Sequence, residues 1–417
     1  MKLKRLAALD QATSCPASLL PPELWIYILR FFKRRETRHS RCQLYHVALV
    51  SSFFYDITVP LLYSHLILFT YSRSAILSSR HSVPSFPNPT ATPAIVAIRA
   101  IANRSSLQPA VKSIQLVGHI DTVVLSRRMS ARTSDIIEAD ELRNTLVSTL
   151  PLLTSLRSVA LNAISLTSEL SAALFHLPQL IKLVLVDCRA PIPPISIFRE
   201  RPNENKLVHV ELSFGSWTDT QTELEFISAF LYGPNLRTLV TDQSQVLTSL
   251  LHHQIRSKLS HLGLHRFGEK DAGLVAEFLG SQRCSDLKIL DLEDCEFPQW
   301  VESSTVFPVF NLLQTFIGPP QIAHLFLSSE SNVEEVTFRS SNIGESEVGP
   351  DLTHLAWVGG VRSLEIQLPR KQFIDGAVWA MFRDSFRALR VLRIHHNVAV
   401  ESLQVCIPSN PPWSIQP

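Results

Sequence analysis

A short sequence pattern recurs over residues 111–400 and constrains the fold of this chain more than any other feature. Segments 180–188 and 287–295 both read LxxLxLxxC, and segment 389–397 reads LxxLxIxxN. Looser copies begin at Val111, Leu156, Leu207, Leu236, Leu259, Leu313, Val333, Leu352 and Val361. Counted without the copy at 352, the starts from residue 156 onward lie 20 to 29 residues apart. A repeat of this length is typical of one small structural unit stacked many times.

The apolar residues at the fourth and sixth positions of each copy predict a β-strand with one buried face. Leu290 and Leu292 are one such pair. Residues two apart on a strand point to the same side, so the third, fifth and seventh positions face the other way. Cys188 and Cys295 close their copies where the chain leaves the strand. We expect both thiols to pack in the core, because a free cysteine behaves as a small apolar residue.

Helical patterns lie between the predicted strands. Apolar residues recur at helical spacing in 170–177, 224–231 and 274–279, and a longer helix is predicted over 134–150. Thr167 or Ser168 is a candidate N-cap for the first of these. A unit of one strand and one helix cannot bury its own apolar face. We therefore expect the fold class to be α/β, a curved solenoid with parallel strands on its concave side.

This pattern resembles that of leucine-rich-repeat proteins, over about residues 105–400. Several copies replace leucine by valine, isoleucine or phenylalanine, so the resemblance is to a degenerate example. In that family the concave strand side commonly binds another protein. Strand alternation places the candidate substrate-binding residues there: His209, Glu211, Asp242, His261, His265, Asp291 and Glu293. Acids outnumber fixed positive charges among them. This face is then either an ordinary solvated surface or a patch that binds basic or histidine-complementary segments of a protein partner.

A different pattern precedes the repeats. Segment 20–29 reads LPPELWIYIL, with prolines where the first turn of a helix tolerates them and an acid near the positive end of the helix dipole. Its apolar residues surround the helix, which predicts burial on every side. In a module of about fifty residues, one side is then left for a partner. After a basic insert, Ser51 or Ser52 can cap a third helix, and 65–69 predicts a strand.

Segments 20–29, 49–57 (LVSSFFYDI) and 60–68 (PLLYSHLIL) resemble an F-box of the fungal type that precedes degenerate leucine-rich repeats. The resemblance implies docking to a Skp-type adaptor and, through it, to the cullin scaffold of a ubiquitin ligase. In this chain a basic insert replaces the acidic-leucine step between the first two helices, and Phe54 stands where many F-boxes have tryptophan. The residues matching the two F-box motifs are Leu20, Pro21, Glu23, Leu24, Ile28, Leu29, Val50, Ser51 and Phe54.

The sequence thus predicts five regions. An N-terminal tail (1–17) precedes the F-box-like module (18–69), and a connector with a proline-rich loop (70–110) leads to the solenoid (111–400) and a C-terminal tail (401–417).

Composition narrows the partners and the compartment. The chain has 39 basic and 37 acidic residues, a net charge of +2, which argues against nucleic acid or a membrane surface as partner. None of the six cysteines forms a CxxC pair, and the first ten residues hold too short an apolar run for a signal peptide. We expect a reduced, intracellular protein, in the cytoplasm or nucleus.

No enzyme motif is present: the chain has no GxGxxG, Walker, GxSxG or HExxH segment. On strands, His261 and His265 are expected about 13 Å apart and His209 about 10 Å from His261. Zinc ligands each lie about 2 Å from the ion, so these distances predict no metal site. Because no enzyme motif is present, we also predict no cofactor and no catalysis.

Two functions remain. The first is a substrate-recognition adaptor of an SCF-type ubiquitin ligase, in which the repeats bind the protein to be ubiquitinated. The second is a stand-alone protein-binding scaffold, whose front helices only cap the end of the solenoid. Exposure of Leu24, Ile28 and Leu29 favours the adaptor.

Overall fold

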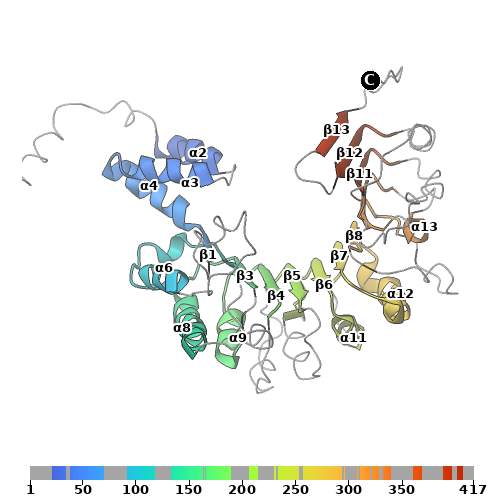
Figure 1. Cartoon of the computed structure of the whole chain (residues 1–417), viewed down its shortest axis with the longest axis horizontal. Coiled ribbons are helices and arrows are strands. Elements are labelled where there is room, and N and C mark those ends of the chain that lie inside the picture. Colours follow the sequence, from blue (N-terminus) through green and yellow to red (C-terminus); the bar gives the residue numbers. More distant parts are fainter. Residues whose placement is uncertain are drawn as a thin grey trace, which may run out of the picture. The chain divides into compact units, whose positions relative to one another are not determined.

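A computed structural model of the chain describes residues 21–33, 38–69, 92–117, 133–162, 164, 166–188, 206–214, 230–231, 233–252, 257–293, 295, 308, 310–319, 322–327, 332–339, 360–368, 388–396 and 402–406. The chain divides into two compact units, residues 1–159 with 176–179, and residues 160–175 with 180–417. Figure 1 labels the helices and strands of both units. The predicted boundaries at 69 and 110 both fall inside the first unit.

The described part of the first unit begins with three helices, α2 (Pro22–Lys33), α3 (Arg38–Ala48) and α4 (Ser52–Tyr63). Pro22 opens α2, where its missing N–H costs no intrahelical hydrogen bond. The N-cap of α4 is Ser51, whose Oγ accepts a hydrogen bond of 3.3 Å from the N–H of Phe54. The rings of Trp25 and Phe54 meet edge to face, with 5.0 Å between their centroids, and join α2 to α4.

Two parallel strands follow these helices in the same unit. Strand β1 (His65–Phe69) pairs with β2 (Ser113–Val117), with Leu66 opposite Ile114. Helix α6 (Thr92–Ala102) and the 3-10 helix η3 (Gln108–Ala110) connect the two strands. Helix α8 (Thr133–Thr149) and the 3-10 helix η4 (Leu150–Leu152) confirm the predicted helix over 134–150. The segment 65–69 thus forms a strand of the sheet, as its sequence pattern predicts.

Strand β3 (Ser158–Asn162) lies at the division between the units, and the strands of the second unit follow it in chain order. Their parallel pairing continues from each strand to the next as far as β12. These strands are β4 (Lys182–Val186), β5 (His209–Ser213), β6 (Thr238–Thr241), β7 (His261–Leu264), β8 (Ile289–Asp291), β9 (Thr315–Gly318), β10 (Glu335–Phe338), β11 (Ser363–Leu368) and β12 (Val391–His396).

The register of this sheet follows the sequence repeat. The fourth residue of each copy stands opposite the fourth residue of the next, and each is at most 2% exposed: Leu183, Val210, Leu239, Leu262, Leu290, Phe316, Val336, Leu364 and Leu392. The predicted register is confirmed, including the copy that begins at Leu313. The copy at Leu352 lies outside the described residues, and β10 pairs directly with β11. One parallel strand per copy is the arrangement of a leucine-rich-repeat solenoid.

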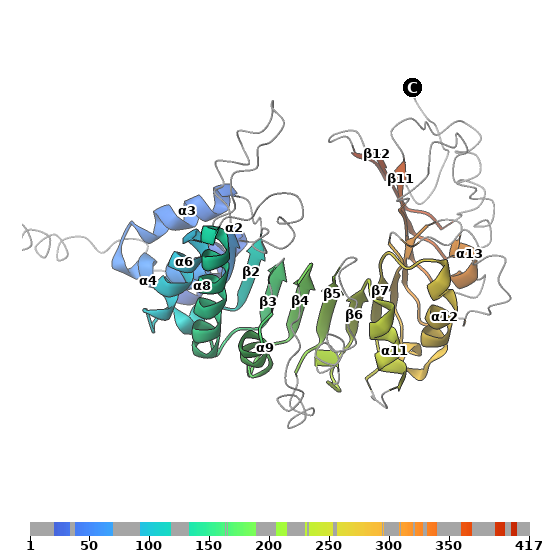
Figure 2. The ribbon, with the colours of Figure 1, turned by 60° about the horizontal axis from the view of Figure 1, so that its bottom comes forward.

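Helices connect several of these strands and cover one side of them. Helices α9 (Ser168–Phe175), α11 (Ser244–His252) and α12 (Ala272–Gly280) lie on the same side of the strands in both ribbon views (Figure 1, Figure 2), and a short helix α13 (Ala323–Phe326) follows β9. Each of the three longer helices buries apolar side chains. The Oγ1 of Thr167 accepts a hydrogen bond of 3.3 Å from the N–H of Leu170, which confirms the predicted cap of α9.

The two cysteines that end the best copies are core residues, as predicted. Both Cys188 and Cys295 are buried. The thiol of Cys295 donates a hydrogen bond of 2.9 Å to the backbone carbonyl of Leu264, and that of Cys188 makes a 3.5 Å contact with the carbonyl of Leu161. Each acceptor is the sixth residue of the preceding copy. The thiol therefore satisfies a backbone group where the previous strand ends.

The segment predicted as a C-terminal tail contains one more strand. Strand β13 (Ser402–Cys406) pairs antiparallel with β12, and Leu392 stands opposite Val405. The assignment of residues 402–406 to a tail is therefore corrected. Leu403 and Val405 alternate with polar residues, which suits a strand, and β13 pairs the edge of β12 that would otherwise carry unpaired backbone groups.

No helix in the described parts of the chain combines the length and apolar character needed to cross a membrane.

Replacing the fully buried Leu290 by alanine is expected to lower the free energy of unfolding by about 2–5 kcal/mol, because it leaves a cavity between Leu262 and Phe316. The control, Lys288→Ala, removes an exposed side chain next to the same strand and is expected to change stability by less than about 0.5 kcal/mol. Urea unfolding measures both. Equal effects of the two substitutions would contradict the register described above.

Candidate protein-binding surfaces

The first F-box-like motif divides between exposed and buried residues. Leu24 and Ile28 are 48% and 37% exposed, one turn apart on the same side of α2, and Tyr27 between them is 75% exposed. Pro21 and Glu23 are also exposed, and Leu20 lies outside the described residues. Leu29 is only 3% exposed, so it belongs to the core of the helices and is not available to a partner, contrary to the prediction.

The second motif divides in the same way. Val50 is 70% exposed in the turn between α3 and α4. Ser51 is exposed and caps α4. Phe54 is buried between the rings of Trp25 and Phe53, so its predicted role as a partner contact is replaced by a role in the core. A sequence motif that marks apolar positions does not tell which of them a small helical module buries.

The helices also expose apolar side chains that are not among the residues matched to the two F-box motifs. Together with the three motif residues above, they form a set that we call the front apolar residues: Leu24, Tyr27, Ile28, Tyr45, Leu49, Val50 and Tyr55. Single exposed apolar residues are normal on protein surfaces. Seven large ones within 32 residues of sequence make these helices a candidate binding surface. The apolar character around the whole of α2 was the signal for it in the sequence.

The second candidate surface is the side of the sheet that carries the third, fifth and seventh residues of each copy, which we call the odd-position face. On β5, His209 and Glu211 lie two residues apart, with 3.8 Å between Nε2 and Oε2. The adjacent His209 imidazole lowers the pKa of the Glu211 carboxyl, although burial of this carboxyl acts in the opposite direction. Both side chains are partly buried.

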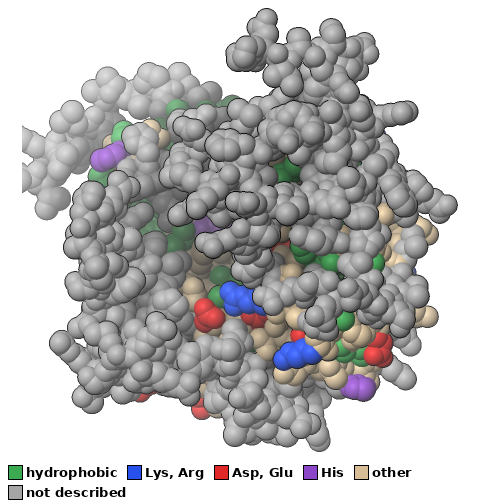
Figure 3. Space-filling model, turned by 45° about the vertical axis from the view of Figure 1, so that its right-hand side comes forward, with side chains coloured by type: hydrophobic (Ala, Val, Ile, Leu, Met, Phe, Trp, Pro, Cys, Tyr) green, Lys and Arg blue, Asp and Glu red, His purple; other side chains and the backbone are tan. Residues whose placement is uncertain are grey.

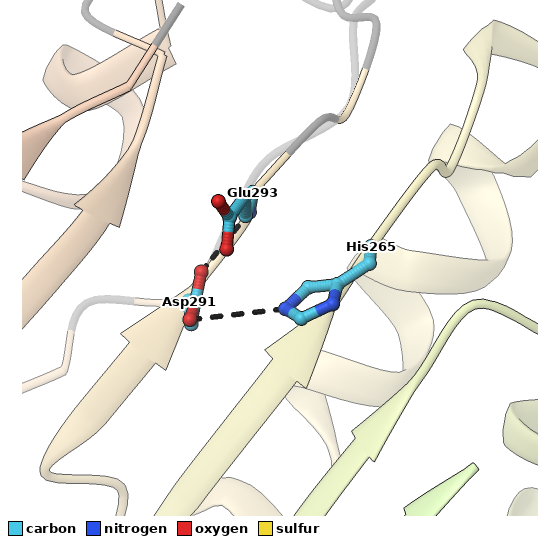
Figure 4. A group of neighbouring side chains, drawn as sticks. All are labelled: His265, Asp291 and Glu293. Carbon is cyan, nitrogen blue, oxygen red and sulfur yellow. Dashed lines mark hydrogen bonds and ion pairs between the residues drawn. The ribbon is translucent and has the colours of Figure 1, made fainter. Parts of the chain in front are cut away.

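His265, Asp291 and Glu293 come together at the ends of β7 and β8 (Figure 4). The Nε2 of His265 lies 3.8 Å from Oδ2 of Asp291, and Oδ1 of Asp291 accepts a hydrogen bond of 3.1 Å from the backbone N–H of Glu293. Burial lowers the pKa of His265, but the Asp291 carboxylate outweighs it and the net pKa is raised.

His261 occupies the third position of β7, where its Nε2 is buried and has no hydrogen-bond partner. Burial lowers the pKa of its imidazole, and the charge of Asp291 opposes this only in part. The other predicted binding residues lie on strands β5, β7 and β8 or within two residues of their ends: His209, Glu211, His261, His265, Asp291 and Glu293.

Asp242 differs from the other predicted binding residues. Its side chain is 2% exposed, with Arg266 3.8 Å away. Its carboxylate accepts hydrogen bonds from the hydroxyl of Ser213, the N–H of Phe214 and the amide of Gln243. Burial and these hydrogen bonds give it a structural role at the ends of β5 and β6, in place of the predicted contact with a partner.

Charges on the odd-position face are largely paired within the protein. Among the described residues of β4 to β12 and the positions directly after them, six carboxylates and three fixed positive charges occupy the face. Arg339 contacts Glu293 at 2.5 Å, and Arg393 contacts Glu365 at 3.7 Å. In the space-filling view, acidic and basic side chains lie side by side (Figure 3). The pairing leaves less unbalanced negative charge than the sequence pattern indicated.

The side chains of His265, Asp291 and Glu293 each offer a donor atom, and these three atoms lie within 4.8 Å of one another. Expected distances between the histidines alone led to the prediction of no metal site. The folded structure is what shows that the side chains of Asp291 and Glu293 approach His265 at the strand ends.

Comparisons with known proteins give only distant likenesses. No protein-family model and no curated protein matches the chain. The chain is similar to the solved structure of the TLR13–ssRNA13 complex, with 12% identity and a TM-score of 0.30; the match covers 69% of this chain and 46% of that one, so this chain spans about half its length. It is also similar to an internalin (InlF) from Listeria monocytogenes, with 13% identity and a TM-score of 0.26, over 73% of this chain and 89% of that one. These likenesses assign no function, and the fold rests on the strand register.

The lowered pKa of His261 predicts a specific loss of stability in acid. The folded state binds this proton less readily than the unfolded state, so the stability that His261 contributes is present above its ordinary pKa and is lost as the pH falls toward the folded value. In His261→Gln, the fall in free energy of unfolding between about pH 7 and pH 5 should be smaller than in the wild type, by urea unfolding at each pH. The control, His252→Gln at the exposed end of α11, should keep the wild-type pH dependence.

Proposed function

We propose that this chain is the substrate-recognition adaptor of a cullin-based, SCF-type ubiquitin ligase. Helices α2, α3 and α4 bind a Skp-type adaptor, and the repeats bind the protein to be ubiquitinated. The chain itself is not an enzyme in this proposal, since ubiquitin transfer belongs to other subunits of such ligases. A role of this kind places it in the cytoplasm or the nucleus.

The exposure of apolar side chains on α2 carries the proposal. Leu24, Tyr27 and Ile28 stand on one side of the helix, while Trp25 and Leu29 pack on the other side or in the core. Burying a leucine-sized side chain contributes about 1.5–3 kcal/mol. The side of α2 that carries Leu24 and Ile28 is thus available to an apolar partner. Binding there need not disturb the core of the three helices. The F-box resemblance selects a Skp-type adaptor as that partner.

The repeats supply a separate surface for the protein to be ubiquitinated. Parallel strands about 4.8 Å apart present the odd positions of successive copies as regular rows. His209, Glu211 and His261 occupy such rows with partly buried side chains, so a partner that displaces water there meets polar groups in fixed positions. The internal charge pairs favour recognition by shape and hydrogen bonding over simple attraction to a basic segment.

One observation favours the second function, a stand-alone scaffold with a helical cap. Leu107, which precedes β2, shares a buried cluster with Ala48 of α3 and Val59 of α4, and Tyr63 packs against this cluster. The helices therefore contribute to the core of the first unit, as a solenoid cap does. This contact buries Ala48 and Val59, and it leaves the front apolar residues exposed.

The double substitution Leu24→Asp with Ile28→Asp tests the adaptor proposal. Because a charge on each side chain opposes its transfer into an apolar interface, affinity for a purified Skp-type adaptor should fall by at least about 100-fold, measured by titration calorimetry. Circular dichroism and thermal unfolding should match the wild type, since both side chains are partly exposed.

The matched control is Val96→Asp, an exposed apolar residue of α6 in the same unit, which should bind the adaptor as the wild type does. Undiminished adaptor binding by the double variant would contradict the docking surface proposed here. Failure of the wild-type chain to bind any Skp-type adaptor would favour the scaffold.

A further inference from the structure

We propose that His265, Asp291 and Glu293 form a binding site for a first-row divalent cation of the Zn²⁺ or Mn²⁺ type. The inference does not depend on the ubiquitin-ligase proposal, because it rests on side chains of the second unit alone. The three donor atoms come from two neighbouring strand ends and lie within 4.8 Å of one another (Figure 4).

The backbone brings these residues together through the register of β7 and β8. Gly263 stands opposite Asp291, and His265 follows two residues later on the same side of the chain. Because Gly263 has no side chain, nothing from the fifth position of β7 covers the Asp291 carboxylate. A Cβ atom added at Gly263 would lie 3.0 Å from the side chain of Val240 on β6, so the neighbouring strand already fills the other side of the glycine.

The distance between His265 and Asp291 suits a shared ion better than a direct hydrogen bond. Their Nε2 and Oδ2 atoms are 3.8 Å apart, beyond the usual hydrogen-bond range, and Nε2 of His265 is buried without a hydrogen-bond partner. Two donors that each lie about 2.0–2.2 Å from one metal ion are at most about 4.4 Å apart. An ion between them would satisfy the buried nitrogen with little movement of either side chain.

The chemistry of the donors selects the class of ion. One imidazole and two carboxylates suit Zn²⁺ or Mn²⁺, whereas Mg²⁺ and Ca²⁺ prefer oxygen alone and Cu⁺ prefers sulfur. Arg339 contacts Oε2 of Glu293 at 2.5 Å and neutralises part of the negative charge, which leaves the second oxygen of this carboxylate for the ion. Three protein ligands leave a coordination position for water or for a donor group of a bound molecule.

The pair His209 and Glu211 provides an internal comparison. Its Nε2 and Oε2 atoms have the same separation of 3.8 Å, and Nε2 of His209 is likewise buried without a hydrogen-bond partner. Within the described residues, no third acidic, histidine or cysteine donor joins this pair in a ligand group. The two pairs therefore separate the effect of a histidine–carboxylate contact from that of a three-donor site.

Titration calorimetry of the full chain with Zn²⁺, and separately with Mg²⁺, tests the site. We expect one Zn²⁺ ion to bind the wild type at this site, with affinity lowered by at least about tenfold in His265→Ala and in Glu293→Gln, because each variant lacks one ligand. His209→Ala should bind Zn²⁺ as the wild type does. Mg²⁺ should bind this site more weakly than Zn²⁺, because it prefers oxygen ligands alone.

Thermal unfolding provides a second readout, because an ion bound to the folded chain stabilises it. Zn²⁺ should raise the melting temperature of the wild type and of His209→Ala, and should raise it less in His265→Ala and Glu293→Gln. If His265→Ala or Glu293→Gln fails to fold, Asp291→Asn is measured in its place, because it keeps the shape of the side chain. Equal Zn²⁺ stoichiometry, affinity and thermal shift in the wild type and all ligand variants would overturn the proposal.

Discussion

Parallel pairing of the fourth residue of each copy with the fourth residue of the next is the constraint on which the second unit depends. From Leu183 on β4 to Leu392 on β12, one apolar side chain per strand is buried at this position. The backbone hydrogen bonds between strands and the burial of these side chains require the same register. A shift by one residue would expose the apolar row and bury the polar one. The positions of all other side chains on the sheet follow from this.

That register also creates the odd-position face, which is the part of the sheet most relevant to function. A polar residue there is carried to a defined row, but its environment depends on its neighbours. Asp242 is buried by hydrogen bonds at the strand ends, whereas Asp291 faces a glycine and remains beside His265. Residues that look equivalent in the sequence therefore serve different purposes, one in holding two strands together and the other in a group of metal-type donors.

The front helices obey a different balance. A module of three short helices has too little volume to bury every apolar residue of α2. Leu29 and Phe54 enter the core, and Leu24 and Ile28 remain partly exposed. The same helices also bury Ala48 and Val59 against Leu107. Contribution to the core of the first unit and availability to a partner are thus compatible, because they use different side chains.

The amino-acid sequence by itself determined the repeat, its strand register and the burial of Cys188 and Cys295. These follow from local periodicity, and periodicity is visible in one dimension. It also located α8 and α12, through the helical patterns over 134–150 and 274–279, but not α11, in which serine and threonine weaken the helical signal.

Only the tertiary structure decided which motif residues are buried, that Asp242 is enclosed, that 402–406 adds an antiparallel strand, and that His265 meets Asp291 and Glu293. Each of these depends on contacts between residues far apart in the chain or on competition for a small core. The spacing pattern predicts which strand positions pair and which face is buried. It does not predict which side chains win a place in a small core, or how close individual side chains approach one another at the strand ends.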